Sequence, residues 1–207
     1  MDPIRHDKAQ QLRQADTIPY AAKFDRSHHL ADAATLSDGD TVTIAGRVVL
    51  MRPMGKMSFL TLQDHTGRLQ LAMRDDELGA DAHKEAVKMI DLGDFIGVTG
   101  TFFTTQKGEP TIQVSSWTML TKALRQPPEK WHGVHDQETA WRQRYLDLMS
   151  NRETLERFLF RSEFVRKLRE FYWKHDFTEV ETPVLVNAAS GALATPFTSH
   201  HEAYDLD

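Results

Sequence analysis

Two short stretches with alternating residue types, 57–63 and 68–73, carry the side chains with the clearest potential for binding chemistry. Leucine and methionine fill one set of alternate positions, while the other set includes Phe59, Arg68 and Gln70. Successive side chains of a strand point to opposite faces, so these three residues would share the face away from the leucines. An aromatic ring can stack on a nucleobase and an amide can read a base edge. The pattern predicts a surface for single-stranded nucleic acid; the alternative is a solvated sheet face with one stray phenylalanine.

The residues between the two stretches, Asp64-His65-Thr66-Gly67, favour a tight turn. Glycine tolerates positive φ, and an aspartate side chain can accept hydrogen bonds from the backbone that follows it. The two stretches are therefore expected to pair as a β-hairpin with its leucines facing a core.

Composition restricts the class of protein. The chain has 207 residues, of which 40% are hydrophobic and 27% charged, as expected for one large or two small globular domains. The net charge of −5 excludes a uniformly basic surface, so a nucleic-acid partner would have to meet a local basic patch. The absence of cysteine excludes disulfides and thiolate metal sites. No apolar run reaches the ~18 residues that span a membrane, and the first residues lack the apolar segment of a signal peptide.

The order of elements in residues 41–120 points to one fold. Strand patterns and one helical pattern follow one another as strands 41–51, 57–63 and 68–73, helix 80–90, and strands 94–104 and 111–120. Gly46 is expected to mark a bend or bulge in the first strand. The order matches the five-stranded OB-fold β-barrel, whose helix lies between its third and fourth strands. A β-sandwich is the competing architecture, and the lone helix in that position disfavours it.

The segment before this domain has weaker patterns. Residues 1–20 are polar with a thin apolar stripe at 9–15, so we expect a weakly ordered arm. A short helix is expected at 30–36. His28 and His29 are expected to be surface residues, because no partner ligand stands at a metal-site spacing.

The segment after the domain contains one long helix. Ser150 and Glu153 suit a capping box, with Ser150 as the N-cap of a helix that runs to about residue 174. Its apolar residues cover more than one stripe, so the helix must be covered on two sides, by a deep core or by a subunit interface. Residues 177–182 are expected to form a strand that ends at Pro183.

Residues 142–148, the long helix and residues 177–185 resemble the opening of the class II aminoacyl-tRNA synthetase catalytic domain, including its first signature motif. The OB-fold upstream narrows the resemblance to subclass IIb, which is specific for lysine, aspartate or asparagine. An ordered set of stretches resembles the lysyl-tRNA synthetase family within this subclass. These stretches are 54–56, 59–64, 120–125, 131–133, 136–138, and Pro196-Phe197 with His200-His201. The stretches at 121–125 and 131–133 argue against the aspartate and asparagine enzymes.

The resemblance implies an α+β chain with four parts. These are an N-terminal arm with a short helix (1–36), an OB-fold anticodon-binding domain (37–121), a connector (122–141), and the start of an antiparallel α/β catalytic domain (142–207). Residues 142–207 also favour a synthetase over the alternative, a stand-alone OB-fold RNA-binding module without ligase activity.

The resemblance also implies roles for individual residues. In the family the OB-fold binds a tRNA anticodon that is rich in uridine. Phe59 matches a ring that stacks on an anticodon base, and Gln70 and Glu109 match groups that read the anticodon. Arg52 matches a basic residue lining the same surface, although strand alternation cannot be followed across Gly46 to test this. Considered without the family, Glu109 would be a solvated turn residue.

Two further site residues follow from the same resemblance. Gly191 is the candidate for the amino-acid pocket, and Pro183 is the candidate for a homodimer interface. The family usually has glycine at the position of Asp176, a second glycine at Ser190 and arginine at Thr195, so the details of this loop differ.

The implied enzyme attaches lysine to tRNA(Lys) with ATP and Mg²⁺ in the cytoplasm, without a membrane. The family's ATP-binding motifs come later than the resembling segments, so the chain is expected to be about the first 40% of such an enzyme. It is therefore expected to hold no catalytic residue, metal or ATP, and to be inactive alone.

Overall fold

A computed structural model describes residues 2–15, 17–128, 133–134, 136–184, 197 and 199–205. The chain forms two compact units, residues 1–135 and 136–207, and each is described by itself.

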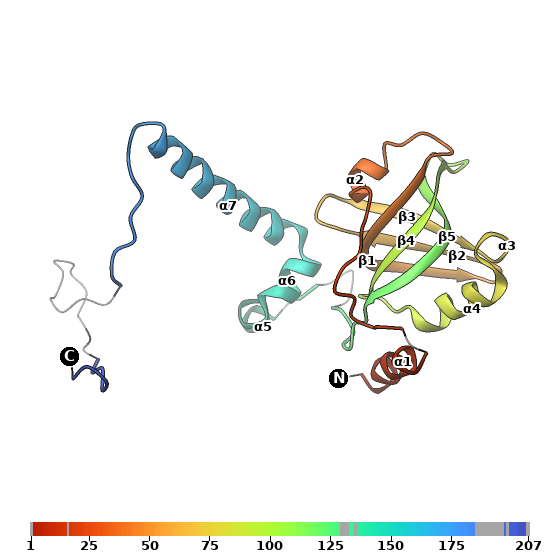
Figure 1. The fold of residues 1–207 in the computed structure, drawn as a ribbon, viewed down its shortest axis with the longest axis horizontal. Helices are drawn as coiled ribbons and strands as arrows, with labels where there is room; N and C mark the ends of the chain where they lie inside the picture. Colours follow the sequence, from red (N-terminus) through yellow and green to blue (C-terminus); the bar gives the residue numbers. More distant parts are fainter. Residues whose placement is uncertain are drawn as a thin grey trace. The chain divides into compact units, whose positions relative to one another are not determined.

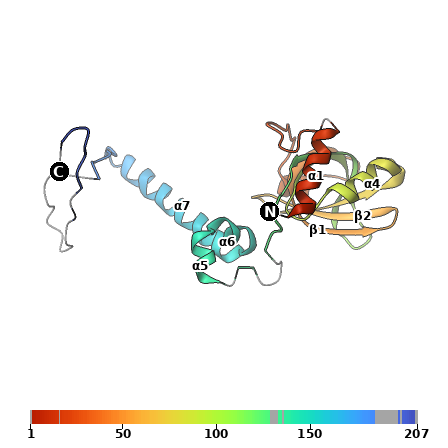
Figure 2. The same ribbon diagram turned by 90° about the horizontal axis from the view of Figure 1, so that it is seen from below.

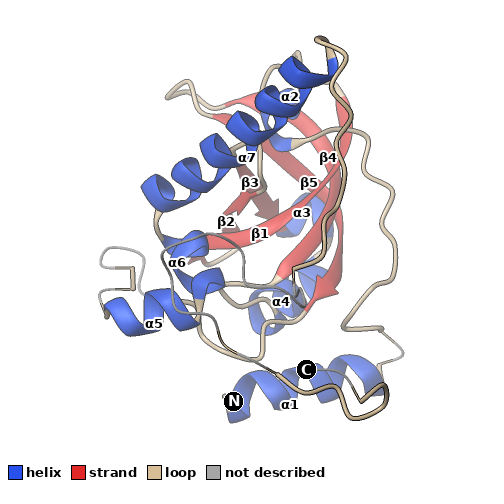
Figure 3. Ribbon diagram, turned by 90° about the vertical axis from the view of Figure 1, so that its left-hand side faces the viewer, coloured by secondary structure: helices blue, strands red, loops and turns tan. Residues whose placement is uncertain are grey.

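Five strands of the first unit close on themselves in a ring (Figures 1 and 3). The strands are β1 (Thr41–Met54), β2 (Met57–Gln63), β3 (Arg68–Arg74), β4 (Phe95–Thr104) and β5 (Pro110–Thr121). They hydrogen-bond in the order β1-β2-β3-β5-β4, with every neighbour antiparallel except β3 and β5. The predicted order of the OB-fold is confirmed.

The apolar faces of the strands fill the inside of the ring. Leu60 and Leu62 of β2 are buried together with Leu69 and Leu71 of β3, as the alternation predicts. Each fully buried side chain of this size contributes roughly 1.5–3 kcal/mol to folding. The hairpin's other face, with Phe59, is therefore turned outward.

Gly46 does not form the expected bulge. It pairs in regular register with Ile96, and the register with β2 shifts between Val48 and Leu50 instead. Gly46 lacks a side chain for a steric reason, since a Cβ atom there would lie 3.1 Å from the Gln63 carbonyl oxygen and 3.1 Å from the Leu62 Cβ atom.

Two helices lie between β3 and β4. The predicted helix is α4 (Ala80–Met89), and a short α3 (Asp75–Leu78) that the sequence pattern did not indicate precedes it. Ala86 and Met89 of α4 belong to the core, and the buried His83 ring hydrogen-bonds the buried Ser58 hydroxyl at 2.9 Å.

The prediction of a weakly ordered N-terminal arm was wrong. Residues Pro3–Gln14 form α1, which lies beside the strands at one end of the first unit (Figure 2). The Asp2 side chain caps this helix, and Ala9 and Leu12 are buried. The thin apolar stripe suffices because polar contacts add to it: the Arg5 guanidinium donates to the carbonyls of Leu92 and Ala123.

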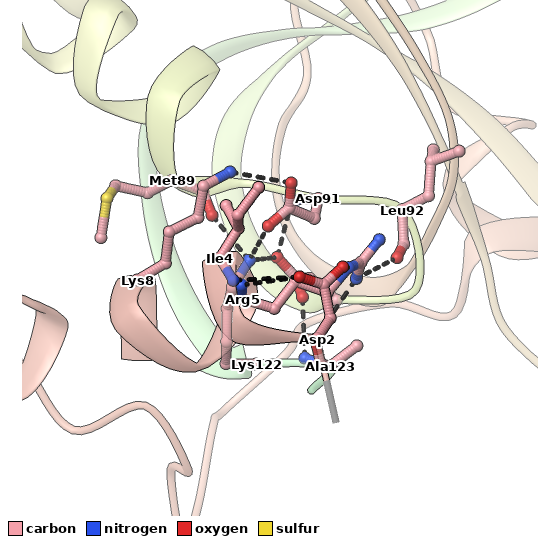
Figure 4. Close-up of polar contacts among 10 residues, drawn as sticks. Asp2, Ile4, Arg5, Lys8, Met89, Asp91, Leu92, Lys122 and Ala123 are labelled. Carbon is pink, nitrogen blue, oxygen red and sulfur yellow. Dashed lines mark hydrogen bonds and ion pairs between the residues drawn. The ribbon is translucent and has the colours of Figure 1, made fainter. Parts of the chain in front are cut away.

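A buried cation joins these contacts (Figure 4). Lys122 is 1% exposed, and its ammonium group lies 2.6 Å from an oxygen of Asp94, 2.5 Å from one of Asp91 and 2.8 Å from the Met89 carbonyl. Lys8 of α1 reaches Asp91 at 2.8 Å from the other side. Burial raises the pKa of Asp94 despite these partners, whereas hydrogen bonds from Lys122 and Lys8 outweigh burial and lower the pKa of Asp91.

The β2–β3 turn fixes a second short helix, α2 (Leu30–Ala33). Asp64 accepts hydrogen bonds from the backbone N–H groups of Thr66 and Gly67 in its own turn and from that of Leu30 in α2. Burial opposes ionisation of Asp64, but the Thr66 hydroxyl and these N–H groups outweigh it and lower its pKa to about 2.

The second unit contains α5 (Gln137–Arg142), α6 (Arg144–Ser150) and α7 (Arg152–Trp173). The long helix was predicted, but its N-cap is Asn151, whose side chain accepts from the Thr154 N–H, and not Ser150. Ser150 is the last residue of α6, and its hydroxyl donates to the Leu146 carbonyl one turn back in that helix.

The predicted strand at 177–182 is absent from the described residues. Phe177 and Val180 are exposed, and no described segment offers them a hydrogen-bonding edge. A lone extended segment cannot complete a ladder, so alternation by itself overestimated this element. Residues 177–180 instead lie beside α7, where the Arg169 guanidinium pairs with Glu179 at 2.9 Å.

Among the helices that the structure describes, none is long and apolar enough to cross a membrane.

Lys122→Met should lower the free energy of unfolding of the first unit by about 3–5 kcal/mol, because two carboxylates lose their buried cation. Lys8→Met is the matched control, since it removes only the outer partner of Asp91. Urea unfolding at neutral pH measures both. Equal losses for the two variants would contradict a dominant role for the buried ammonium.

Asp64→Asn should lower the free energy of unfolding by about 1–2 kcal/mol at pH 7, a range that allows for solvent screening. The pKa of about 2 lies below the ordinary value of 3.8, so this contribution is present above that value and is lost as the pH falls toward 2. Urea unfolding at several pH values should show the two proteins converging in acid. Asp81→Asn, an exposed position on α4, should show no such convergence.

Candidate nucleic-acid interface

A row of paired residues crosses the outer face of the sheet. Arg52 of β1 lies opposite Phe59 of β2, which lies opposite Ala72 of β3. Ala72 pairs with Gln113 of β5, and Gln113 with Thr101 of β4. Directly paired residues in a ladder point to the same side of the sheet. Arg52, which the sequence alone could not place, is therefore on the same face as Phe59, and its side chain is exposed.

A second row runs beside the first. Thr61 lies opposite Gln70, Gln70 pairs with Thr111, and Thr111 lies opposite Phe103. The Gln70 amide donates to the Thr111 hydroxyl at 3.0 Å, and this hydroxyl donates to the Glu109 carbonyl at 3.1 Å. The chain of hydrogen bonds holds the Gln70 side chain in place beside the β4–β5 turn.

The surface over these rows has two hollows. The wide groove, of about 500 Å³, is lined by Met57, Phe59, Ala72, Arg74, Glu77, Thr101, Phe103, Thr105 and Gln113. The Gln70 hollow, of about 130 Å³, is lined by Thr61, Arg68, Leu69, Gln70, Glu109 and Pro110. The predicted residues Phe59, Gln70 and Glu109 therefore line two hollows of one face, with Arg52 opposite Phe59.

The turn between β4 and β5 positions Glu109. Gly108 has φ +80°, a conformation that favours glycine, and the Thr105 hydroxyl accepts from the Glu109 N–H at 3.0 Å. The Glu109 side chain is exposed and lines the Gln70 hollow. A carboxylate beside an amide can accept from and donate to the edge of one base.

Aromatic and cationic groups complete the face. Phe59 and Phe103 are half-buried at the wide groove, and each keeps ring surface accessible for stacking. Arg52 is exposed, whereas the guanidinium of Arg68 donates to Gln63 and that of Arg74 pairs with Asp76. The face therefore combines stacking, edge recognition and positive charge, as single-stranded nucleic acid requires.

Sequence reasoning missed the contribution of β5. Ile112 and Val114 are buried, so their alternation places Thr111 and Gln113 on the outer face. Only the parallel register with β3 brings these two residues next to Gln70 and Ala72.

A second cluster lies away from this face, where His29, Asp64 and His65 offer ligand atoms within 4.8 Å of one another. His29 lies 35 residues before Asp64 in sequence, so spacing rules could not detect the cluster. The Asp64 oxygens already accept four hydrogen bonds, from Leu30, Gly67 and two groups of Thr66. Three of these bonds end on one Asp64 oxygen and one on the other, so the Asp64 carboxylate joins its own turn to the start of α2.

The remaining predicted site residues belong to the second unit. Pro183 is exposed after α7. Gly191, with Ser190 and Thr195, lies outside the described residues.

Comparison with known proteins agrees with this arrangement. Residues 42–120 match the family model of the OB-fold nucleic acid binding domain, and residues 136–206 match that of the class II tRNA synthetases (D, K and N).

Curated relatives cover nearly the whole chain. It is 46% identical over 206 residues to the lysine–tRNA ligase of Carboxydothermus hydrogenoformans, covering 98% of this chain and 42% of the relative. It is 48% identical over 189 residues to that of Thiobacillus denitrificans, covering 91% and 38%, and 42% identical over 214 residues to that of Enterococcus faecalis, covering 99% and 43%. The chain thus spans about two fifths of the length of these relatives. Residues 136–206 thus match the class II tRNA synthetases of the D, K and N group, and the chain is similar over nearly its whole length to lysine–tRNA ligases.

Proposed function

We propose that this chain is the part of a lysine–tRNA ligase that binds the anticodon of tRNA(Lys) and contributes to a homodimer. The supporting observation is the outer face of the sheet, where Phe59, Gln70 and Glu109 line two hollows and Arg52 lies opposite Phe59. The match of residues 136–206 to the synthetase family favours this function over a stand-alone RNA-binding module.

Each residue has a distinct role in this proposal. Phe59 stacks on one anticodon base, while Gln70 and Glu109 hydrogen-bond the edge of a base in the Gln70 hollow. Arg52 attracts the phosphates next to Phe59. Electrostatic attraction to phosphates is independent of sequence, so discrimination between anticodons falls to the amide and the carboxylate.

The ligase activity of the proposed whole enzyme uses lysine and ATP with Mg²⁺, and Gly191 is proposed to lie at its amino-acid pocket. Arg152, Arg157 and Arg166 of α7 each pair with glutamates about one helical turn away. We therefore derive no step of ATP chemistry from this chain. The proposed location of the enzyme is the cytoplasm.

The homodimer proposal rests on α7. Phe160, Phe164 and Phe171 are 73%, 57% and 54% exposed, and Leu159, Leu168, Tyr172 and Trp173 are also exposed. A helix with so much uncovered apolar surface favours association, and a second copy of the chain supplies an equally apolar helix. Pro183, exposed in the segment after α7, is proposed to lie at the same interface.

Phe59→Ala should weaken binding of the chain to an anticodon stem-loop of tRNA(Lys) by about 1–3 kcal/mol, the scale of one stacked base. Stacking tolerates any base, so loops with one uridine replaced should lose a similar amount. Fluorescence titration of cognate and variant loops measures this. Unchanged cognate affinity would show that this face is only a solvated sheet surface.

Gln70→Ala and Glu109→Gln should act on selectivity. Loss of the amide should weaken the cognate loop more than a loop with one uridine changed, because a donor to the base edge is removed. Glu109→Gln keeps the size of the side chain but turns a pure acceptor into a mixed donor and acceptor, so it should relax discrimination. Arg52→Gln is the contrasting variant, which should mainly reduce the salt dependence of binding. Equal losses for cognate and variant loops with Gln70→Ala would exclude base reading.

Phe164→Asp should raise the dissociation constant of the self-associated chain about tenfold or more, because a charge is placed on the apolar surface of α7. Ser162→Asp, which adds the same charge at an exposed polar position of the same helix, is the matched control and should change it little. Sedimentation equilibrium of the whole chain gives both constants. A wild-type chain that stays monomeric at high concentration would contradict the proposal.

A further inference from the structure

The wide groove contains a side-chain donor that has no hydrogen-bond partner among the described residues. The Gln113 Nε2 atom is buried, and no acceptor lies within hydrogen-bonding distance of it in the described part of the chain. Gln113 belongs to the outer row between Ala72 and Thr101 and lines the wide groove together with Phe59 and Phe103.

An unsatisfied buried amide is costly, and folded proteins rarely keep one without a reason. Rotation of the amide exchanges its donor and acceptor atoms, so either orientation presents a hydrogen-bonding atom and not a hydrocarbon at this place. A glutamine without a partner in the wall of an open groove indicates that its partner arrives with a ligand.

The groove has space for that ligand next to Phe59. Ala72, whose side chain is a single methyl group, stands between the Phe59 ring and the Gln113 amide, so the surface is hollow there. Phe59 and Gln113 are two strand spacings apart, or about 10 Å. The neighbouring amide, Gln70, lines the other hollow. The two amides therefore serve different parts of the face.

We propose that Gln113 reads the base of a second nucleotide, distinct from the base that Gln70 and Glu109 read. This base enters the wide groove, and the Gln113 amide, rotated so that its N–H₂ group faces the groove, donates to an acceptor such as a uracil or cytosine carbonyl oxygen. Phe103, from the neighbouring strand β4, lines the same groove. This inference rests on the proposed binding of an anticodon loop.

Gln113→Met is the informative variant, because it keeps the length of the side chain and removes the donor. The probes are a short RNA hairpin with an unmodified UUU anticodon and hairpins that each lack one of these bases. The whole chain with Gln113→Met should bind the intact hairpin about two- to tenfold more weakly, the usual scale of one hydrogen bond. One of the abasic hairpins should bind the variant and the wild type with equal affinity, because it lacks the base that Gln113 reads. Gln70→Met should likewise match the wild type in affinity for one abasic hairpin, but the missing base should be a different one.

The outcomes separate this inference from the proposed function. If Phe59→Ala weakens binding but Gln113→Met does not, or if both glutamines couple to the same base, the second reading site is overturned and the anticodon face remains. If Phe59→Ala has no effect on the hairpin, the proposed function fails and this inference fails with it.

Thermal unfolding separates base reading from a structural role. Removing a buried amide that has no partner in the free protein should leave the melting temperature unchanged or raise it. A clear fall in the melting temperature with Gln113→Met would show that the amide supports the fold, and would also overturn the inference. Gln70→Met, which breaks the hydrogen bond to Thr111, should lower the melting temperature and serves as the comparison.

Discussion

The outer face of the sheet depends on a short parallel ladder between β3 and β5. Only three residue pairs form it, Gln70 with Thr111, Leu71 with Ile112, and Ala72 with Gln113. The middle pair closes the core, and the outer two pairs assemble the candidate interface. The same β3–β5 register therefore closes the core and forms the candidate interface. A change that shifted β5 by one residue would turn Thr111 and Gln113 inward and remove both hollows.

This ladder also explains which parts of the site could be predicted. Alternation within the β2–β3 hairpin was enough to place Phe59 and Gln70 outward and Leu60 and Leu71 inward, because an adjacent hairpin fixes its own register. Pairing between β3 and β5 joins segments about 40 residues apart, and no local pattern specifies that register. The contribution of Gln113 became visible only in the closed sheet, whereas the role of Glu109 was suggested by family resemblance and not by its position in a turn.

Three incorrect predictions from the sequence have one physical origin. The arm at α1, the bulge at Gly46 and the strand at 177–182 were all judged from local sequence, although each depends on distant partners. Distant polar contacts hold α1, and the packing of Gly46 against Leu62 and Gln63 explains its lack of a side chain. In the described residues, the segment 177–182 has no neighbouring strand at all.

The anchoring of α1 has a consequence for biosynthesis. Asp2 donates its N–H to the Leu124 carbonyl, Arg5 reaches the Ala123 carbonyl, and the Lys122 N–H donates to the Pro19 carbonyl. At roughly 5–20 residues per second, the ribosome needs about 6–24 s to extend the chain from Asp2 to its partner Leu124. During translation the arm therefore emerges long before its docking site exists. The residues of α1 therefore leave the ribosome early but are among the last of the first unit to dock. Their polar, weakly apolar character keeps them soluble until then.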